Sequence, residues 1–391
     1  MKKLIIHNER ISDAAELIKV CPFGALEISD GKVVTNSACK RCGVCAKRSK
    51  NGEIEIVEEK TESVDKSLWN GICVYVEHID GEIHPVTLEL IGKARELADK
   101  IGHKVFCLMM GENVSESAKE LLSYPVDEVF VYDKSALKSF RQETYASVFE
   151  DFINRVKPSV ILVGATTVGR QLAPRVAARF RTGLTADCTV LDIEENTDLV
   201  QIRPAFGGNI MAQIATPNNR PQMATVRYKV MDQAKRCEPF GKLTFFDISD
   251  DKLKSGVEIL SVEKKPKVEG IENAEIIVAA GRGCRNDSEL ELVKKLADAL
   301  GGTWACTRPM VESGKCPANR QIGLSGRTVR PKLIITCGIS GAVQFAAGMK
   351  GADTIVAINT DKNAPIFSIA HYGIVGDLCE IVPKLIEKLG R

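Results

Sequence analysis

Hydrophobic and polar positions alternate in blocks along most of the chain. Residues 70–78 (NGICVYVEH) form an apolar run that predicts a buried strand, and residues 86–102 (VTLELIGKARELADKIG) show the period of an amphipathic helix. The same order recurs as far as residues 159–165 (SVILVGA). Apolar strands that alternate with amphipathic helices predict a parallel sheet with helices on both faces. Residues 211–216 (MAQIAT) and 223–231 (MATVRYKVM) are expected to add strands to that sheet.

A second block of the same kind follows a charged segment. Residues 251–272 are rich in lysine and glutamate, which is typical of an interdomain linker and equally of a solvated edge strand and loop. Strand–helix alternation resumes at residues 274–283 (AEIIVAAGRG) and ends in a helix over residues 377–390. We therefore predict an α/β fold with two parallel-sheet domains, at residues 66–250 (nucleotide-binding-like) and 273–391 (Rossmann-like).

Residues 1–65 follow neither pattern, because they combine short β-like runs with closely spaced cysteines. A length of 391 residues suits two or three domains. The net charge of +2 gives no reason to expect nucleic acid or an anionic membrane as a partner. The chain shows neither the apolar core of a signal peptide nor a run of about 18 apolar residues. A cytoplasmic protein without a membrane span is expected.

Three cysteines, Cys39, Cys42 and Cys45, stand two residues apart from one another. Bacterial ferredoxins hold 4Fe–4S clusters with the run C-x2-C-x2-C-x3-C-P, in which the fourth cysteine ligates the other cluster of a two-cluster protein. Here Ser49 occupies the fourth position. Cys21, in the sequence CPFG, matches the fourth position of an earlier run and is free to complete a cluster on the three later cysteines.

The positions that a second cluster needs are all changed together. They hold Ile11, Ala14, Leu17 and Ser49. Because one ligand set is lost completely and the other is intact, we predict a ferredoxin-like α+β domain at residues 1–65 with one 4Fe–4S cluster. A structural zinc site is the alternative, although such a site normally uses two separate C-x2-C pairs. The metal ligands expected are Cys21, Cys39, Cys42 and Cys45.

The other nine cysteines are scattered through the α/β blocks. In a cytoplasmic protein, thiols of this kind are expected to be buried small hydrophobes and not a disulfide framework. They are Cys73, Cys107, Cys188, Cys237, Cys284, Cys306, Cys316, Cys337 and Cys379.

Two glycine-rich turns follow predicted strands in the second α/β block. Residues 279–286 (AAGRGCRN) lack the third glycine of G-x-G-x-x-G, so this turn alone is also typical of a plain strand-to-helix connection. Residues 337–345 (CGISGAVQF) predict a helix that opens at Ser340–Gly341 and offers its amides to a phosphate. Later polar residues, in 356–361 (VAINTD) and 371–378 (HYGIVGDL), come where parallel strands end and α/β ligands bind.

These motifs, with TRPMVESG (307–314), QIGLSGR (321–327) and NTDKNAPIF, resemble the α subunit of electron-transfer flavoproteins. The similarity extends back through residues 163–188 and 203–209, so it covers about residues 66–391. The cysteine-bearing extension resembles the versions joined to flavin-based electron-bifurcating enzymes of anaerobes, such as the caffeyl-CoA reductase and lactate dehydrogenase complexes.

The resemblance implies one FAD in the C-terminal domain. It places Arg282 against the isoalloxazine, where a fixed charge favours a negatively charged reduced flavin. Residues 340–344 are implied to hold the pyrophosphate and part of the ring. The chain departs from many members at Phe345 and Leu324, which replace a histidine and a glutamine. The implied FAD contacts are Arg282, Thr307, Arg308, Ile322, Gly323, Leu324, Ser325 (near flavin N5), Ser340, Gly341, Ala342, Val343, Gln344, Phe345, and, at the adenosine half, Asn359, Asp377 and Leu378.

The resemblance also implies electron transfer between partners, and no residue is assigned a catalytic role. The expected partners are a β subunit with a second FAD and the NADH site, which would contact residues 66–250, an acyl-CoA dehydrogenase-like or lactate dehydrogenase-like flavoenzyme, and ferredoxin. The leading hypothesis is electron bifurcation with a caffeyl-CoA reductase-like acceptor enzyme. The alternatives are a lactate dehydrogenase complex, a non-bifurcating carrier, and a non-redox nucleotide-binding protein with a zinc-stabilised N-terminal module.

Overall fold

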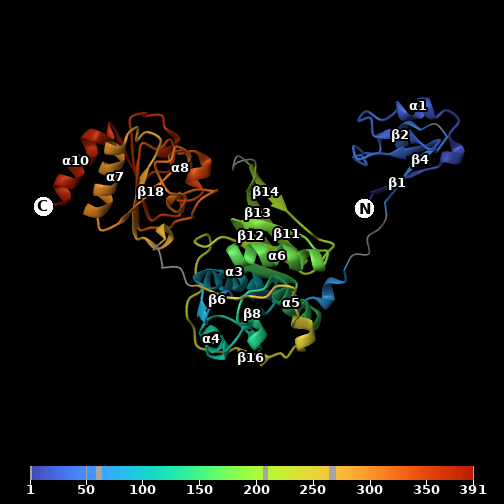
Figure 1. The fold of residues 1–391 in the computed structure, drawn as a ribbon, viewed down its shortest axis with the longest axis horizontal. Coiled ribbons are helices and arrows are strands. Elements are labelled where there is room, and N and C mark those ends of the chain that lie inside the picture. Colours follow the sequence, from blue (N-terminus) through green and yellow to red (C-terminus); the bar gives the residue numbers. More distant parts are fainter. Residues whose placement is uncertain (1, 50, 59–63, 206–209, 264–269, 391) are drawn as a thin grey trace. The chain divides into compact units, whose positions relative to one another are not determined.

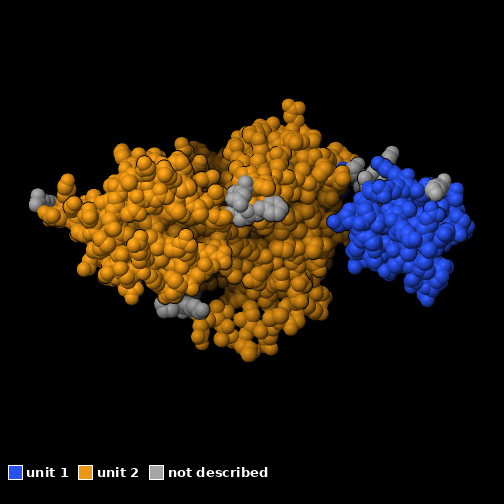
Figure 2. Space-filling model, turned by 90° about the horizontal axis from the view of Figure 1, so that it is seen from above, with its two compact units in different colours: residues 1–64 blue, residues 65–391 orange. Residues whose placement is uncertain are grey.

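The computed structural model describes residues 2–49, 51–58, 64–205, 210–263 and 270–390. The chain divides into two compact units, residues 1–64 and residues 65–391, which Figure 2 shows in different colours. The first unit has an α+β fold, and the second contains two separate parallel sheets with their helices (Figure 1). The predicted fold class is confirmed.

The first unit consists of two antiparallel strand pairs and two short helices. Strand β1 pairs with β4, and β2 pairs with β3 in a hairpin. Helix α1 begins after Asp13, whose carboxylate accepts hydrogen bonds from the first free amides of the helix. Its elements are β1 (Lys2–Ile6), α1 (Ala14–Ile18), β2 (Leu26–Ser29), β3 (Lys32–Thr35), α2 (Val44–Arg48) and β4 (Ile54–Glu58).

Apolar side chains occupy the positions where a second cluster would have its ligands. Leu17 is buried in the core of the first unit, and Ile11 and Ala14 pack against the same core. Ser49 ends α2 instead, and its hydroxyl donates to the carbonyl oxygens of Ala46 at 3.1 Å and Ile54 at 3.4 Å. These four positions therefore stabilise the fold through packing and hydrogen bonds.

The second unit begins with a seven-stranded sheet in the order β11-β15-β10-β5-β8-β9-β16, in which every neighbouring pair is parallel. The edge strand β16 had no counterpart in the sequence prediction. The strands are β5 (Ile72–Tyr75), β8 (Val105–Gly111), β9 (Glu128–Asp133), β10 (Val160–Gly164), β11 (Leu184–Cys188), β15 (Gln222–Val226) and β16 (Lys242–Phe245). The helices are α3 (Pro85–Ile101), α4 (Ser115–Glu120), α5 (Gln142–Val156) and α6 (Thr167–Arg179).

Both faces of this sheet are buried, because successive strand residues point to opposite sides. Ile72 and Val74 join a core with α3 and α4, whereas Cys73 and Tyr75 join a second core with α5 and α6. The sequence sets the ends of α3 locally. Pro85 stands in the first helical turn, and Gly102 ends the helix with a left-handed φ of 66°.

A separate antiparallel sheet extends from this domain in the order β12-β13-β14. Its strand β14 takes up residues 211–214 of the segment 211–216 that was expected in the parallel sheet, so that prediction is wrong, whereas β15 does join the parallel sheet as expected. The burial pattern explains the difference: β14 is largely exposed, and all five residues of β15 are buried. The strands are β12 (Val190–Ile193), β13 (Leu199–Ala205) and β14 (Ile210–Ile214).

The third region contains a five-stranded parallel sheet in the order β18-β17-β19-β20-β21. Helices α7 and α10 pack on one face with Leu290 and Val382 in their shared core (Figure 1). The strands are β17 (Ile276–Ala280), β18 (Thr303–Cys306), β19 (Leu333–Cys337), β20 (Thr354–Asn359) and β21 (Tyr372–Val375). The helices are α7 (Asp287–Ala299), α8 (Arg308–Glu312), α9 (Val343–Ala346) and α10 (Leu378–Leu389).

The predicted linker, residues 251–272, lies between the two parallel sheets in sequence. Its first residues belong to a 3-10 turn at Asp250–Leu253, and the side chains of Val257 and Leu260 are exposed. Residues 264–269 of the predicted linker lie outside the described residues. The division into domains at residues 65, 250 and 273 stays a prediction.

Candidate functional site

The carboxyl ends of the five-stranded sheet bring most of the predicted FAD contacts to one edge. β17 has β18 on one side and β19 on the other, so the chain changes direction between these strands. Such a switch point opens a crevice at the strand ends, where nucleotides bind in open α/β sheets. Arg282, Thr307 and Ser340 all follow within three residues of a strand that ends there.

Bare glycine backbone fills the switch point. The amide of Gly283 donates to the carbonyl oxygen of Gly338 at 2.9 Å, which joins the turn after β17 to the turn after β19. A Cβ on Gly281 would lie 2.3 Å from that same carbonyl oxygen. The two turns therefore require glycine for close approach, and Gly338 also has a left-handed φ of 62°.

The segment after β19 differs in one respect from the sequence prediction. The helix expected to open at Ser340–Gly341 begins at Val343 and has only four residues. Residues 340–342 instead form a non-helical connection, in which the Ser340 carbonyl oxygen accepts from the amide of Ile366 at 2.9 Å. A Cβ on Gly341 would lie 2.3 Å from the Ile366 nitrogen. The predicted start of the helix is therefore wrong, whereas the implied pyrophosphate contact of residues 340–344 stays a prediction.

Backbone hydrogen bonds bring the segment at residues 322–325 into the same site. The amide of Ile322 donates to the carbonyl oxygen of Cys306 at 2.9 Å, and the amide of Leu324 donates to that of Gln344 at 2.9 Å. The buried Gln321 side-chain amide donates to the exposed Ser325 hydroxyl at 2.8 Å. Sequence reasoning missed this role of Gln321, which fixes the orientation of Ser325.

Several other residues predicted to contact FAD form hydrogen bonds or ion pairs within the protein. Arg308 forms an exposed ion pair with Glu312 at 2.8 Å. The Asn359 amide donates to the carbonyl oxygen of Ile339 at 2.8 Å, and Asp377 accepts from the first turn of α10. The Arg282 side chain is exposed beside the glycine turns.

Some predicted contacts are apolar. Leu378 and Phe345 are buried in the cores on either face of the sheet, which leaves their backbone as the polar part facing the crevice. Ala342 and Val343 are exposed, so their side chains remain accessible at the start of α9. The cradle of bare glycines and the polar groups around it suit an elongated nucleotide such as FAD.

The first unit contains a second site, in which the four predicted metal ligands line one hollow. Cys21 comes from the turn after α1, and Cys39, Cys42 and Cys45 come from the loop and first turn of α2. Gly43 makes the turn between the last two cysteines with a φ of 81°. Sequence positions 21 and 39–45 therefore meet in space, as the ferredoxin-like pattern requires.

One hydrogen bond at the sulfurs is of the kind that a thiolate ligand accepts, whereas burial favours the neutral thiol of Cys45. The amide of Ala25 donates to the Cys21 sulfur at 3.3 Å, a kind of contact that tunes iron–sulfur clusters. Burial raises the pKa of Cys45, and the nearby Cys21 and Cys39 raise it further. Within the part of the chain that the structure describes, no three His, Cys, Asp or Glu side chains are arranged around a single ion. The four expected metal ligands therefore stay a prediction.

The remaining cysteines do not all behave as expected. Cys306 and Cys316 form a disulfide, so the prediction of free buried thiols is wrong for this pair. Cys237 and Cys379 are exposed. The other five are buried free thiols, and burial raises the pKa of Cys284 to about 11 and that of Cys188 to about 12.

Comparisons with known proteins cover both units. A family model described as "Electron transfer flavoprotein domain" matches residues 72–244, and one described as "Electron transfer flavoprotein FAD-binding domain" matches residues 270–350.

Across the parts of the chain that the structure describes, no helix has the length and apolar character needed to cross a membrane.

Several curated proteins are similar over most of the chain. The "Lactate dehydrogenase (NAD(+),ferredoxin) subunit LctC" of Acetobacterium woodii is 57% identical over 99% of this chain and 93% of its own length. An "Electron transfer flavoprotein subunit alpha" of Thermoanaerobacterium thermosaccharolyticum is 47% identical over 83% of this chain and 98% of its own. The "Acryloyl-CoA reductase electron transfer subunit beta" of Anaerotignum propionicum is 41% identical over 84% and 97%. The chain therefore belongs to the electron transfer flavoprotein α-subunit family and carries the FAD-binding domain of that family.

Proposed function

We propose that this chain is the α subunit of an electron-bifurcating lactate dehydrogenase complex and carries both FAD and one 4Fe–4S cluster. It would pair with a β subunit that bears the second FAD and the NADH site, with a lactate dehydrogenase-like flavoenzyme, and with ferredoxin. When bound, FAD and the cluster supply one-electron transfer. The chain itself binds and positions these groups between its partners.

The observation that carries this proposal is the meeting of four cysteines in the first unit. Cys21 lines the same hollow as Cys39, Cys42 and Cys45, although at least 18 residues separate it from them. A family member that only received and passed on electrons through FAD would need no such module. The 99% coverage by the lactate dehydrogenase subunit means that the similarity includes residues 1–64.

The same relative changes the order of the acceptor hypotheses. Sequence reasoning placed a caffeyl-CoA reductase-like partner first and a lactate dehydrogenase second. The relative with 57% identity is named for lactate dehydrogenase, which favours the second hypothesis. The name of the acryloyl-CoA reductase subunit keeps an enoyl-CoA acceptor as the other candidate, at 41% identity.

On the FAD side, the chain's residues would hold the cofactor by close backbone approach. The turns at Gly281, Gly283 and Gly338 pack closely on one another and so form the backbone edge that a pyrophosphate would approach, and Arg282 would place a fixed positive charge beside the flavin. Gln321 holds the Ser325 hydroxyl in a fixed direction at the same edge. On the cluster side, Cys45 is buried, Cys21 and Cys39 are half-buried, and Cys42 is exposed.

The test is to reconstitute the chain with its β subunit and a lactate dehydrogenase-like flavoenzyme under anaerobic conditions. NADH-dependent reduction of ferredoxin is expected only when pyruvate is present, because bifurcation sends one electron of each pair to each acceptor. Dependence on an enoyl-CoA instead of pyruvate would identify the other acceptor class. Reduction of ferredoxin without any second acceptor would contradict bifurcation and favour a one-path carrier.

A further inference from the structure

The disulfide between Cys306 and Cys316 closes a short loop at the edge of the proposed FAD site. Cys306 is the last residue of β18, and Cys316 follows α8 at a sequence separation of 10. Both cysteines are buried, at 0% and 4% exposure, but the flanking Pro317 and Ala318 are exposed. The bond therefore lies directly beneath the surface, with Cys316 on its outer side.

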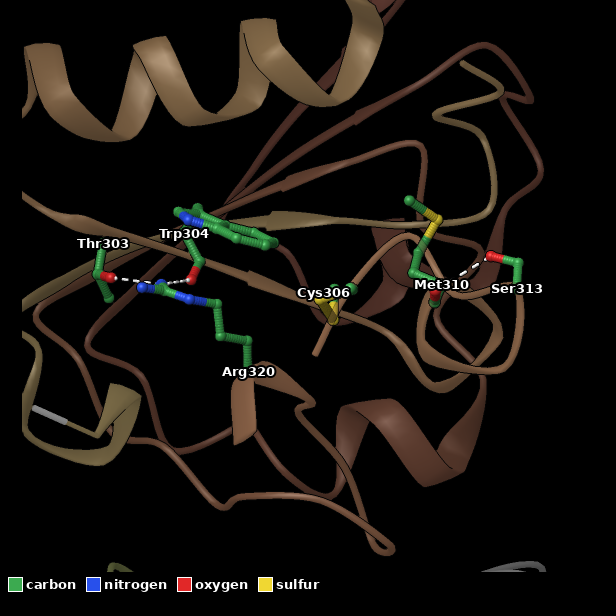
Figure 3. Close-up of a disulfide and its surroundings, with 7 residues drawn as sticks. Thr303, Trp304, Cys306, Met310, Ser313 and Arg320 are labelled. Carbon is green, nitrogen blue, oxygen red and sulfur yellow. Dashed lines mark hydrogen bonds between the residues drawn. A yellow bond between two sulfur atoms is a disulfide. The ribbon is translucent and has the colours of Figure 1, made fainter. Parts of the chain in front are cut away.

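The loop that this bond closes has few other attachments. Helix α8 has only five residues, and its hydrogen bonds are local, such as that from the Ser313 hydroxyl to the Met310 carbonyl oxygen at 3.0 Å (Figure 3). A helix of this length is not stable on its own. The main apolar contacts of the loop with the rest of the domain are the buried Met310 and the partly buried Val311 side chains. Hydrogen bonds add to them, from the Thr307 amide to the Ala280 carbonyl oxygen at 3.1 Å and from Lys315 to the Arg285 carbonyl oxygen at 2.6 Å.

The segment on the other side of the disulfide is fixed independently. The Arg320 guanidinium donates hydrogen bonds to the Thr303 hydroxyl at 2.9 Å and to the Trp304 carbonyl oxygen at 2.7 Å (Figure 3). The guanidinium also lies over the Trp304 ring, 4.5 Å from its centroid. The hydrogen bond from Ile322 to Cys306 adds a further tie to β18. Residues 320–325 would thus keep their place if the disulfide were broken, whereas residues 307–315 would lose one of their two fixed ends.

We propose that Cys306–Cys316 is a reversible redox site, and that its reduction by a dithiol protein of the thioredoxin class loosens the loop that carries Thr307 and Arg308. The proposal rests on the FAD site proposed above, because these two residues are its predicted ring contacts. The site would make FAD retention depend on the thiol–disulfide state of the surroundings. It requires no change in the residues that hold the glycine turns.

The exchange is balanced in atoms and electrons. A thiolate of the reductant attacks the Cys316 sulfur, the bond to Cys306 breaks, and Cys306 leaves as a thiolate that takes a proton. The second thiol of the reductant then displaces Cys316, which also takes a proton. One disulfide is lost in this chain and one is formed in the reductant, with two electrons and two protons transferred. The oxidised form of the same carrier reverses the reaction.

Buried thiols are compatible with this domain after reduction. Cys284 and Cys337 are already free and buried at the ends of neighbouring strands, and burial raises the pKa of both. Reduced Cys306 and Cys316 would be buried in the same way. Neutral thiols pack as small hydrophobes, so the sheet is expected to stay folded while the loop becomes mobile.

The experiment uses the full chain, purified anaerobically and incubated with reduced or oxidised thioredoxin. Alkylation followed by peptide mapping should show Cys306 and Cys316 blocked in the oxidised sample and labelled in the reduced one. FAD binding, followed by flavin fluorescence, should be about tenfold weaker in the reduced sample, which corresponds to re-ordering one or two side chains of the loop.

Two variants complete the design. Cys316→Ala should bind FAD about tenfold more weakly in both samples, and the matched control Cys284→Ala, which removes a buried free thiol, should respond like the unaltered chain. Labelling of Cys306 and Cys316 in the thioredoxin-oxidised sample would overturn the redox site. A cycling disulfide with equal FAD affinity in both states would overturn the loop effect. Absence of FAD binding in every sample would instead contradict the proposed function, while the labelling pattern still decides whether the redox site exists.

Discussion

Cys42 is the exposed member of the four-cysteine set, so its replacement tests the cluster with little effect on packing. Cys42→Ser should lower the iron content of anaerobically purified protein by half or more, because a cubane needs a thiolate at each iron. Cys237→Ser is the control, since Cys237 is also exposed but lies in the other unit. Iron and acid-labile sulfide assays provide the measurement. Equal iron in both variants would show that Cys42 is not a ligand.

Glu89 provides a pH-dependent prediction for stability. It is buried on α3, and both carboxylate oxygens accept the amide of Lys229 at 3.0 Å. Burial raises its pKa from 4.5 to about 7, against the opposing effect of these hydrogen bonds. The folded state therefore holds a proton that the unfolded state has lost, so stability from this group is full below about pH 4.5 and is lost as pH rises through about 7.

The replacement Glu89→Gln removes this titration. Relative to the variant, the unaltered chain should lose roughly 1–3 kcal/mol of unfolding free energy between pH 4.5 and pH 7, as a pKa difference of this kind implies. Urea unfolding at the two pH values measures it. Glu96→Gln, at an exposed position of the same helix, should leave the pH dependence unchanged. A Glu89→Gln variant with the pH dependence of the unaltered chain would contradict the assignment.

Replacement of Arg282 tests whether the flavin ring lies beside the positive charge of this side chain. Loss of its positive charge should make reduction of bound FAD less favourable, by on the order of 60 mV for one electron, equivalent to a tenfold change. Arg282→Gln should show this shift and Arg282→Lys much of the original potential. Arg285→Gln removes an exposed charge three residues further along the same turn and serves as the control. A similar potential in Arg282→Gln and Arg285→Gln would place the ring elsewhere.

At the scale of elements, the connection after β19 depends on backbone space as well as on backbone conformation. Gly341 has a φ of 88°, and a Cβ there would meet the Ile366 backbone. Gly301, at the end of α7, has a φ of 66° but nothing within 4 Å of its Cβ position. Gly301→Ala should therefore cost about 1 kcal/mol of unfolding free energy, and Gly341→Ala roughly 3 kcal/mol or more.

The two variants distinguish the cost of a left-handed backbone conformation from the added cost of a steric clash, within the same domain. Thermal or urea unfolding gives the two costs, and FAD retention should fall only in Gly341→Ala, because only that change displaces residues 340–342. Equal costs in the two variants would mean that the connection has room for a side chain and is not held against Ile366.

The hydrophobic pattern of the sequence predicted strands correctly where all residues of the strand are buried. β5, β10 and β15 are buried on both faces, and their largely apolar runs predicted central strands of a parallel sheet. β14 has a similar composition but is mostly exposed, and nothing in its own residues distinguishes an antiparallel extension from a strand of the main sheet. α9 was expected to begin at Ser340–Gly341, whereas the hydrogen bond from Ile366 to Ser340 belongs to a non-helical connection and the helix begins only at Val343.

At the scale of the molecule, spacing in sequence predicted which cysteines of the first unit lie together better than it predicted the contacts within the C-terminal domain. Cys39, Cys42 and Cys45 are close in sequence, so local geometry alone brings them near one another, and only Cys21 had to be placed by the ferredoxin pattern. Gln321 and the disulfide depend on contacts between segments that a single sequence does not reveal. In the sequence, two cysteines ten residues apart are equally compatible with two buried thiols and with a disulfide.

The account as a whole depends on one chain holding iron and flavin together. The most direct measurement is the content of iron, acid-labile sulfide, zinc and FAD in full-length protein purified without oxygen. About four iron atoms, four sulfides and one FAD per chain are expected, with no zinc, since four thiolates hold one cubane and the C-terminal domain binds one flavin. Zinc in place of iron, or a chain with flavin and no metal, would contradict the central claim.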